Sequence, residues 1–449
     1  MIQLNELEVN GGKVSCKLSV PHSLKHFFKS NTFIVEYDES VESVPDSILV
    51  IPAVMSLAPI AWASNVELFT PPLDEVFHDA LGAIRDGYAK MYPSLFGNDG
   101  SVVVCDRTIH NSFANHSTPA VLFSGGIDSV AAVLTLLEKS PALFTVHGSD
   151  IAMSNHQAWE NVYRQVIEFA KSYALPIHSI KSNFYNVLRY LFVDYKYEHD
   201  LGRGWWGAVQ YGTAFPALCA PIAYLHGYPK VFLGSAGEGN LAYPDAQPIF
   251  VNELKWSGTE AFLADATVRR QDKIARIAKY VRNSHELVIR SCLSSAEGFN
   301  CSECHKCRRT IVGLILEDID PNAVGFSVDK DTLSEIRRDF ESGSIYLSGA
   351  DILFWRDFQQ RIDSKKDYLW DNKKFFNWLA HINIEDYSIP KLSLRLKIVD
   401  QILSIPYPFN SLIYDQLRFI QGLLPLKLVD QLRVYLDDGK SLKKNALKM

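Results

Sequence analysis

This chain of 449 residues lacks several features that define common classes of protein. Its longest hydrophobic run, residues 48–63, is interrupted by Pro52 and Pro59 and is too short to span a bilayer. Its amino terminus has no basic stretch followed by an apolar one, so no secretion signal is predicted. Positive charge is not in excess, because the formal net charge is −6, which argues against a surface built as a whole for nucleic acid. We therefore expect a cytoplasmic protein that does not enter a membrane.

Cysteine is scarce along most of the chain, but four of the seven cysteines lie within sixteen residues. They are Cys292, Cys301, Cys304 and Cys307, with the spacing Cys-x8-Cys-x2-Cys-x2-Cys. In a reducing compartment such clustering indicates a metal site rather than disulfides. Two Cys-x-x-Cys steps share Cys304, and Cys292 completes a tetrahedron of thiolates, which favours a closed structural Zn²⁺ site. An iron–sulfur cluster accepts the same ligands and is the alternative.

The pattern of apolar residues divides the chain into three parts. Residues 1–115 combine alternating segments with one helical stretch and are typical of a small α+β unit. Residues 116–325 alternate strands with helices, which predicts a parallel sheet covered on both faces. Residues 326–449 show helical periodicity and predict a C-terminal helical region. The expected fold class is therefore α/β.

The pattern also predicts individual elements. The strands expected in the middle part are residues 120–123, 142–147, 177–180 and 230–234, and the helices are residues 129–137, 157–173 and 213–226. The helices expected beyond it are residues 330–342, 351–362, 372–382, 392–403 and 426–436.

The string Ser-Gly-Gly-Ile-Asp-Ser at residues 124–129 joins an apolar strand to an apolar helix. Gly125 and Gly126 let the backbone approach a phosphate closely, and the helix that follows directs its free N–H groups and its positive dipole end at the anion. Ser124 and Ser129 add hydroxyl donors, and Asp128 is suited either to a Mg²⁺ held by the nucleotide or to orienting the loop. The string is neither a Walker A loop nor a dinucleotide fingerprint, and in this context it predicts a phosphate site.

This loop resembles the PP-loop of the ATP pyrophosphatases, an adenine nucleotide alpha hydrolase-like fold whose members grip the pyrophosphate of ATP while transferring AMP. With the cysteine spacing, the chain resembles the 7-cyano-7-deazaguanine synthase (QueC) family over about residues 119–312, including a Tyr-Pro-Asp at residues 243–245. In that family ATP activates a deazaguanine carboxylate as an acyl adenylate, and ammonia then gives an amide and finally a nitrile. The resemblance implies ATP, Mg²⁺ and Zn²⁺ as cofactors.

The resemblance also implies roles for individual residues. It assigns catalysis to Ser124, Asp128 and Ser129, ATP binding to Ser124, Gly125, Gly126, Asp128, Ser129, His147 and Gly148, and substrate contacts to Glu238, Tyr243 and Asp245. A turn capped by Asp150 is an alternative explanation for residues 147–150. The chain has His-Gly-Ser-Asp there, where the family has Gln-Arg-His, so the ATP and zinc parts carry over better than the substrate pocket.

The resemblance predicts a QueC-like ligase that adenylates a carboxylate or carbonyl oxygen and passes it to a nitrogen nucleophile. Elongated proteins of this kind resemble those of natural-product clusters and antiphage defence systems, so the acceptor is a small molecule, a protein or a nucleic acid, and other proteins of such an operon are candidate partners. One alternative is a tRNA base thiolation enzyme, which needs catalytic cysteines near the nucleotide. Another is a non-catalytic nucleotide-binding scaffold in a defence complex. For an enzyme, we expect Asp128→Ala and Ser124→Ala to abolish turnover without unfolding the chain.

Overall fold

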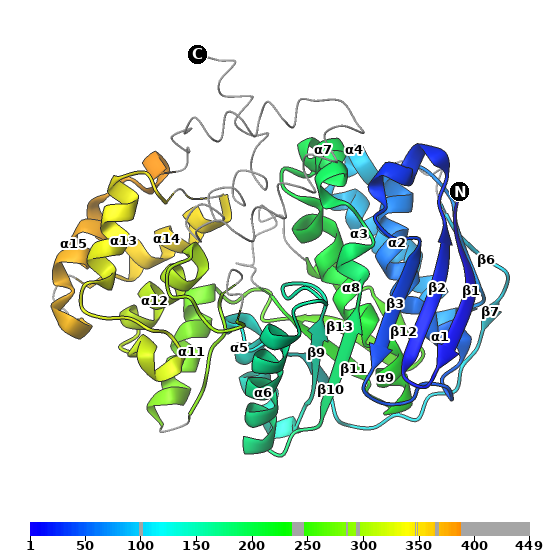
Figure 1. Ribbon diagram of the computed structural model, residues 1–449, viewed down its shortest axis with the longest axis horizontal. Coiled ribbons are helices and arrows are strands. Elements are labelled where there is room, and N and C mark those ends of the chain that lie inside the picture. Colours follow the sequence, from blue (N-terminus) through cyan, green and yellow to red (C-terminus); the bar gives the residue numbers. More distant parts are fainter. Residues whose placement is uncertain are drawn as a thin grey trace, which may run out of the picture. The chain divides into compact units, whose positions relative to one another are not determined.

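The computed structural model describes residues 1–97, 102–235, 247–283, 286–292, 297–345, 347, 349–363 and 368–387. The chain divides into two compact units, Met1–Ile277 and Ala278–Met449. The described residues form an α/β protein with a large, mostly parallel central sheet, as Figure 1 shows. None of the described helices is both long enough and apolar enough to cross a membrane.

The first unit is built on one sheet of eleven strands in the order β12-β13-β11-β8-β9-β10-β3-β2-β1-β4-β6. Its strands are β1 (Ile2–Asn10), β2 (Lys13–Ser19), β3 (Thr32–Tyr37), β4 (Leu68–Thr70), β6 (Val103–Cys105), β8 (Ala120–Leu122), β9 (Ala142–His147), β10 (Ile177–Ser182), β11 (Lys230–Gly234), β12 (Lys255–Trp256) and β13 (Thr259–Ala264). Two further short strands, β5 (Leu73–Asp74) and β7 (Thr108–Ile109), pair with each other.

The burial of the strands follows their place in the sheet. All residues of β8 are buried, and so are all but one of β9, because central parallel strands are covered on both faces. The side chains of β1 and β2 alternate between buried and more exposed positions, because one face of the sheet meets solvent there. Strand β3 pairs antiparallel with β10, so residues 1–115 contribute strands to the same sheet as the segment that follows them.

Strand β8 is a switch point, because later strands are added first on one side of it and then on the other. The chain passes from β8 to β9 and β10 on one side, and β11 and β13 then lie on the other side, all four pairings being parallel. In open parallel sheets, ligands bind at the carboxyl ends of the strands next to such a switch point. By this rule, the end of β8 is where a ligand is expected to bind.

The helices of the first unit include one that is almost wholly buried. They are α1 (Asp46–Leu49), α2 (Ile51–Ala63), α3 (Glu75–Met91), α4 (Pro93–Phe96), α5 (Ile127–Leu136), α6 (His156–Ser172), α7 (Tyr190–Leu201), α8 (Tyr211–Leu218), α9 (Ala220–Leu225), α10 (Pro248–Val251) and the larger part of α11 (Arg270–Arg282), with short turns η1 (His22–Phe27), η2 (Leu137–Lys139), η3 (Phe184–Asn186) and the π-type η4 (Trp206–Gln210). Helix α2 accounts for the longest apolar run of the sequence, because it packs against α8, β1 and β4 in the core.

The second unit is helical in its described part. Its elements are α12 (His305–Leu316), α13 (Thr332–Glu341), α14 (Gly349–Arg361) and α15 (Lys373–His381), with short turns η5 (Pro321–Val324), η6 (Leu369–Asp371) and η7 (Ile384–Tyr387). Two buried ion pairs, Arg308 with Asp339 and Arg309 with Asp351, join α12 to the end of α13 and the start of α14. The helices predicted between residues 330 and 382 are confirmed, whereas those predicted at residues 392–403 and 426–436 lie outside the described residues.

Candidate functional site

The loop after β8 enters α5 through a glycine in the left-handed region. Gly125 has a φ of +74°, which a residue with a side chain rarely adopts. The Ser129 hydroxyl donates to the carbonyl oxygen of Gly126 at 3.0 Å, and its Oγ accepts from the backbone N–H of Ser124 at 3.3 Å. The two serine Oγ atoms lie 3.3 Å apart. The serines therefore brace the loop below the first N–H groups of α5, which have no intrahelical acceptor.

The end of β11 lies directly against the start of α5. A Cβ atom at Gly234 would come within 2.7 Å of the Asp128 carbonyl carbon and 2.9 Å of the Ser129 nitrogen, closer than side chains tolerate. Gly234 therefore permits the close approach of β11 to the loop. This contact brings residues 234 and 235 to the predicted phosphate site.

Two cations of α11 contact the carboxylate of Asp128. Arg270 donates from Nη1 to Oδ2 at 2.7 Å, and Lys273 lies with Nζ 3.4 Å from Oδ1. Lys273 also donates to the carbonyl oxygen of Ser235. The Lys273 side chain is fully buried, and burial lowers the pKa of its ammonium group, while the nearby Asp128 opposes this change. Arg270 and Lys273 thus bring two cations to the one carboxylate of the loop, Asp128, an arrangement suited to an anion.

The engagement of Asp128 bears on its predicted roles. In the structure its carboxylate joins α5 to α11 through Arg270 and Lys273. Such contacts would suit the loop-orienting role that the sequence allows, which stays a prediction. The alternative role, as a ligand of a nucleotide-bound Mg²⁺, stays a prediction.

Sequence reasoning did not identify Arg270 and Lys273. The available signal is the series Arg269, Arg270, Lys273 and Arg276, which brings cations to one side of a helix directly after a strand. Such a series usually marks a solvent-exposed face, and only tertiary packing shows that Lys273 is buried. Arg276, on the same helix, pairs with Asp265 at 2.6 Å just after β13 ends.

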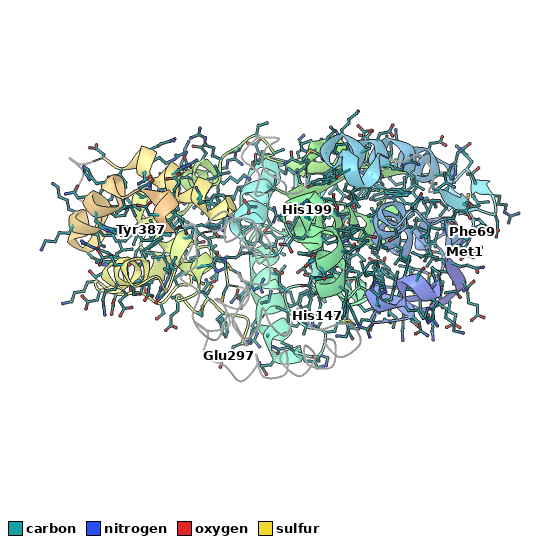
Figure 2. The ribbon with its side chains drawn as sticks, turned by 90° about the horizontal axis from the view of Figure 1, so that it is seen from above. Met1, Phe69, His147, His199, Glu297 and Tyr387 are labelled. Carbon is teal, nitrogen blue, oxygen red and sulfur yellow. The ribbon has the colours of Figure 1, made fainter. Side chains whose placement is uncertain are left out.

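His147 and Gly148 lie at the carboxyl end of β9, next to β8 in the sheet; Figure 2 labels His147. The His147 ring stacks on Trp159 at a centroid distance of 4.5 Å, and Nε2 lies 3.0 Å from the carbonyl oxygen of Ala152. Burial lowers the pKa of His147, which favours the neutral form of its imidazole. Gly148 has a φ of +122°, and a Cβ there would lie 1.8 Å from the Ser182 carbonyl oxygen. These contacts fix the turn after β9, while a contact with ATP stays a prediction.

The three predicted substrate residues, Glu238, Tyr243 and Asp245, lie outside the described residues. They follow β11, whose last residue is Gly234. Their proximity to the loop is therefore a matter of sequence prediction alone.

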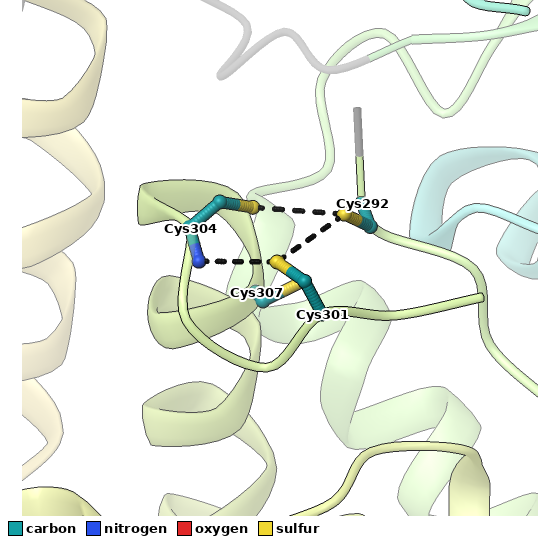
Figure 3. Close-up of side chains that lie close together, drawn as sticks. All are labelled: Cys292, Cys301, Cys304 and Cys307. Carbon is teal, nitrogen blue, oxygen red and sulfur yellow. Dashed lines mark hydrogen bonds between the residues drawn. The ribbon is translucent and has the colours of Figure 1, made fainter. Parts of the chain in front are cut away.

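The four clustered cysteines converge in the second unit, as Figure 3 shows. The Sγ atom of Cys292 lies 3.4 Å from that of Cys301 and 4.0 Å from that of Cys304, and the Sγ atoms of Cys301 and Cys307 are 3.9 Å apart. Sulfur atoms bonded tetrahedrally to zinc at about 2.3 Å are about 3.8 Å apart. The four thiols therefore fit a zinc ion, and we call this group the cysteine cage.

The local chain explains why the thiols meet. Cys304 precedes α12 and Cys307 lies in its first turn, while the backbone N–H of Cys304 donates to Cys301 Sγ at 3.3 Å. Asn300 joins the segment of Cys301 to the segment that carries Cys292. Its Oδ1 accepts from the backbone N–H groups of Ser291 and Cys292 at 2.8 and 3.2 Å. Asn300 is a positioning residue that the cysteine spacing alone did not reveal.

The electrostatics of the cage call for a cation. Hydrogen bonding with Cys292 raises the pKa of Cys307, because a Cys307 thiol that keeps its proton can donate it to a neighbouring thiolate. Four thiolates at these distances are stable together only around a cation. Four cysteines complete a tetrahedral ligand set and leave no position for water or substrate. Such a site is suited to structure rather than catalysis.

The chain was compared with protein-family models, curated proteins and solved structures. No family model, no curated protein and no solved structure matches the chain. What the chain can do chemically therefore follows from its own residues, at the loop of residues 124–129 and in the cysteine cage.

Proposed function

We propose that this chain is an ATP-consuming enzyme of the PP-loop kind that transfers AMP to a carboxylate or carbonyl oxygen and then forms a carbon–nitrogen bond. The observation that carries the proposal is the loop of residues 124–129 at the switch point of the sheet, with Gly125 at positive φ and two buried cations beside it. Anions bind such strand-to-helix loops because backbone N–H groups and the helix dipole converge there.

The residues around the loop would act chiefly by positioning and charge. The hydroxyls of Ser124 and Ser129 and the N–H groups of α5 would hold the pyrophosphate part of ATP, and Mg²⁺ would shield its charge. Arg270 and Lys273 would offset the negative charge that grows on pyrophosphate as it leaves.

The proposed reaction has two steps, adenylation of the acceptor and displacement of AMP. An acceptor carboxylate oxygen attacks the α-phosphorus of ATP, the bond from this phosphorus to the bridging oxygen breaks, and pyrophosphate leaves. A nitrogen nucleophile then attacks the acyl carbon, loses a proton and displaces AMP. The acceptor and the nitrogen donor are co-reactants, which we define only by this chemistry.

The cysteines support this proposal over tRNA thiolation. A sulfur-transfer enzyme needs a reactive thiolate near the nucleotide, whereas the four cysteines of the cage would be committed to a metal ion. Burial raises the pKa of Cys16 to about 12 and that of Cys219 well above the usual range of a thiol. These thiols are unsuited to nucleophilic work.

The products of ATP turnover test the proposal. We would incubate the full chain with Mg²⁺, ATP labelled at its α- and γ-phosphates and a metabolite extract, and separate the labelled products. We expect AMP together with pyrophosphate, because the loop retains pyrophosphate as the leaving group. Steady formation of ADP and phosphate would contradict the proposal.

Binding gives a second measurement that does not need the acceptor. Ser124→Ala should weaken binding of Mg²⁺·ATP about 10- to 100-fold, because a hydrogen bond to a charged group contributes roughly 1.5–3 kcal/mol. Ser172→Ala is the matched control, since this exposed serine bonds only to the backbone of its own helix among the contacts described for it. Equal affinity of the two variants in calorimetry would argue against a phosphate site at the loop.

A further inference from the structure

Three potential metal ligands from distant parts of the chain meet at the other end of the parallel strands. Glu39 lies two residues after β3, His178 is the second residue of β10, and His226 directly follows α9. The antiparallel register pairs Tyr37 with Ile180, and continuing it by two residues sets Glu39 beside His178. His178 is at the amino end of β10, whereas the phosphate loop follows the carboxyl end of β8. This group is therefore separate from the predicted nucleotide site.

The donor atoms of the three side chains are close enough to share one ion. Oε1 of Glu39 lies 3.1 Å from Nδ1 of His178 and 2.8 Å from Nε2 of His226, and all three donors lie within 4.8 Å of one another. Ligands that bind a metal at about 2.1 Å and at right angles are about 3 Å apart. The two distances from Glu39 therefore suit ligands that share one ion.

Neighbouring residues hold both imidazoles in place. The Nε2 atom of His178 lies 2.9 Å from the hydroxyl of Tyr228, and the ring of His226 stacks on that of Tyr228 at 5.5 Å. When the Tyr228 oxygen accepts the Nε2 proton of His178, the lone pair of Nδ1 is left facing Glu39. Metal-binding histidines usually donate their second ring N–H to such a partner, which fixes the tautomer.

The backbone around His226 is equally constrained. Gly227 has a φ of +65°, and a Cβ atom there would lie 1.8 Å from the Ala114 carbonyl oxygen. The backbone N–H of Tyr228 donates to Ala223 at 2.9 Å and closes the turn. The turn thus holds His226 in its position beside Glu39.

Exposure and ligand type indicate what the group binds. The His178 side chain is 9% exposed, while those of Glu39 and His226 are 33% and 36% exposed, so an ion could enter from solvent and keep water ligands. Two imidazoles with one carboxylate suit first-row divalent metals such as Zn²⁺ or Fe²⁺, whereas Mg²⁺ and Ca²⁺ prefer oxygen ligands. We propose that Glu39, His178 and His226 form a second metal site, for a divalent transition-metal ion.

Zinc alone is the probe for this site. The full chain would be loaded with Zn²⁺, freed of loose metal by gel filtration, and its zinc content per chain measured by elemental mass spectrometry. We expect Glu39→Gln and His226→Gln each to bind one zinc fewer than the wild-type chain. His110→Gln is the matched control, because it removes an exposed histidine that also pairs with a glutamate, Glu75, at 3.0 Å; it should bind as much zinc as the wild type.

Tyr228→Phe separates orientation from ligation. It keeps all three donors but removes the hydroxyl beside His178, so we expect affinity for the second zinc to fall roughly 10- to 100-fold in calorimetry. The competing interpretation is a group held only by hydrogen bonds from both imidazoles to Glu39. Equal zinc content in the wild type, Glu39→Gln and His226→Gln, all shown to be folded by circular dichroism, would overturn the proposal. Loss of zinc in the His110→Gln control as well would also overturn it.

Discussion

Asp128 and Lys273 show how strongly two residues at this site depend on each other. A buried ammonium group is costly unless a carboxylate and further hydrogen bonds compensate it. Here Asp128 supplies the charge and the carbonyl oxygen of Ser235 accepts a hydrogen bond. The sequence suggests that Asp128 can be replaced without loss of stability, since loop residues rarely support a core. The structure leads to a different expectation, because Asp128 lies in the first turn of α5 and neutralises a buried cation.

The first prediction concerns this ion pair. Asp128→Ala should lower the free energy of unfolding by about 3–5 kcal/mol, because it leaves Lys273 buried without its counter-charge. The double variant with Asp128→Asn and Lys273→Met should regain part of this loss, since the buried ammonium group is gone and only Arg270 loses its carboxylate partner. Urea denaturation of both variants gives the comparison.

The exposed pair of Glu36 with Lys181 is the matched control for this measurement. Their side chains are 50% and 37% exposed, and the atoms are 3.3 Å apart. Glu36→Ala should therefore cost less than about 1 kcal/mol. If Asp128→Ala proves as mild as Glu36→Ala, Lys273 is not held by Asp128 in the way described.

For function, Ser124→Ala is a cleaner variant than Asp128→Ala. Ser124 has no buried charged partner among the hydrogen bonds described for it, so its loss should affect nucleotide binding rather than folding. If the chain were only a scaffold, Ser124→Ala would leave its biological activity intact. The serine variant thus distinguishes enzyme from scaffold without a change in stability.

At the level of elements, the packing of β11 against α5 determines the shape of the loop. Gly234→Ala should displace the backbone of Asp128 and Ser129 and weaken binding of Mg²⁺·ATP at least tenfold, because a Cβ atom would come within 2.7 Å of main-chain atoms. Gly82→Ala is its control, since a Cβ on this glycine of α3 has no neighbour within 4 Å and alanine favours a helix. Unchanged affinity of Gly234→Ala in calorimetry would contradict this account.

The elements themselves were predicted to different extents. Strand β9 is confirmed at its predicted residues, 142–147, and α5 begins at Ile127, two residues earlier than expected. Asp128 consequently lies in the first turn of the helix. Helix α11 was not predicted, although Ile274, Ile277 and Ala278 recur at helical spacing and the helix carries both cations that reach the loop.

At the level of the whole molecule, the chain consists of two compact units, and the cysteine cage belongs to the second. Binding of a structural zinc adds on the order of 10 kcal/mol to folding in small domains. Cys304→Ser should therefore remove one zinc and lower one calorimetric transition of the full chain, leaving the other in place. Cys105→Ser, at a half-buried cysteine outside the cage, should retain the zinc. A visible iron–sulfur absorbance, or the same zinc content in both variants, would contradict a zinc cage.

The sequence by itself determined the local features of this protein. Strand-to-helix alternation, the loop of residues 124–129 and the spacing of the four cysteines depend on near neighbours in the chain, and the described structure places these elements and the cage as expected. The chemistry assigned to the loop is still a proposal.

Only the tertiary structure decided which distant residues meet. The pairing of β3 with β10 joins the N-terminal strands to the central sheet and brings Glu39 to His178. The packing of α11 beside α5 buries Lys273 against Asp128. Such contacts depend on strand order and register, which bring together residues more than a hundred positions apart. The periodicity of a single segment carries no information about these partners, because it reports only which of its faces is buried.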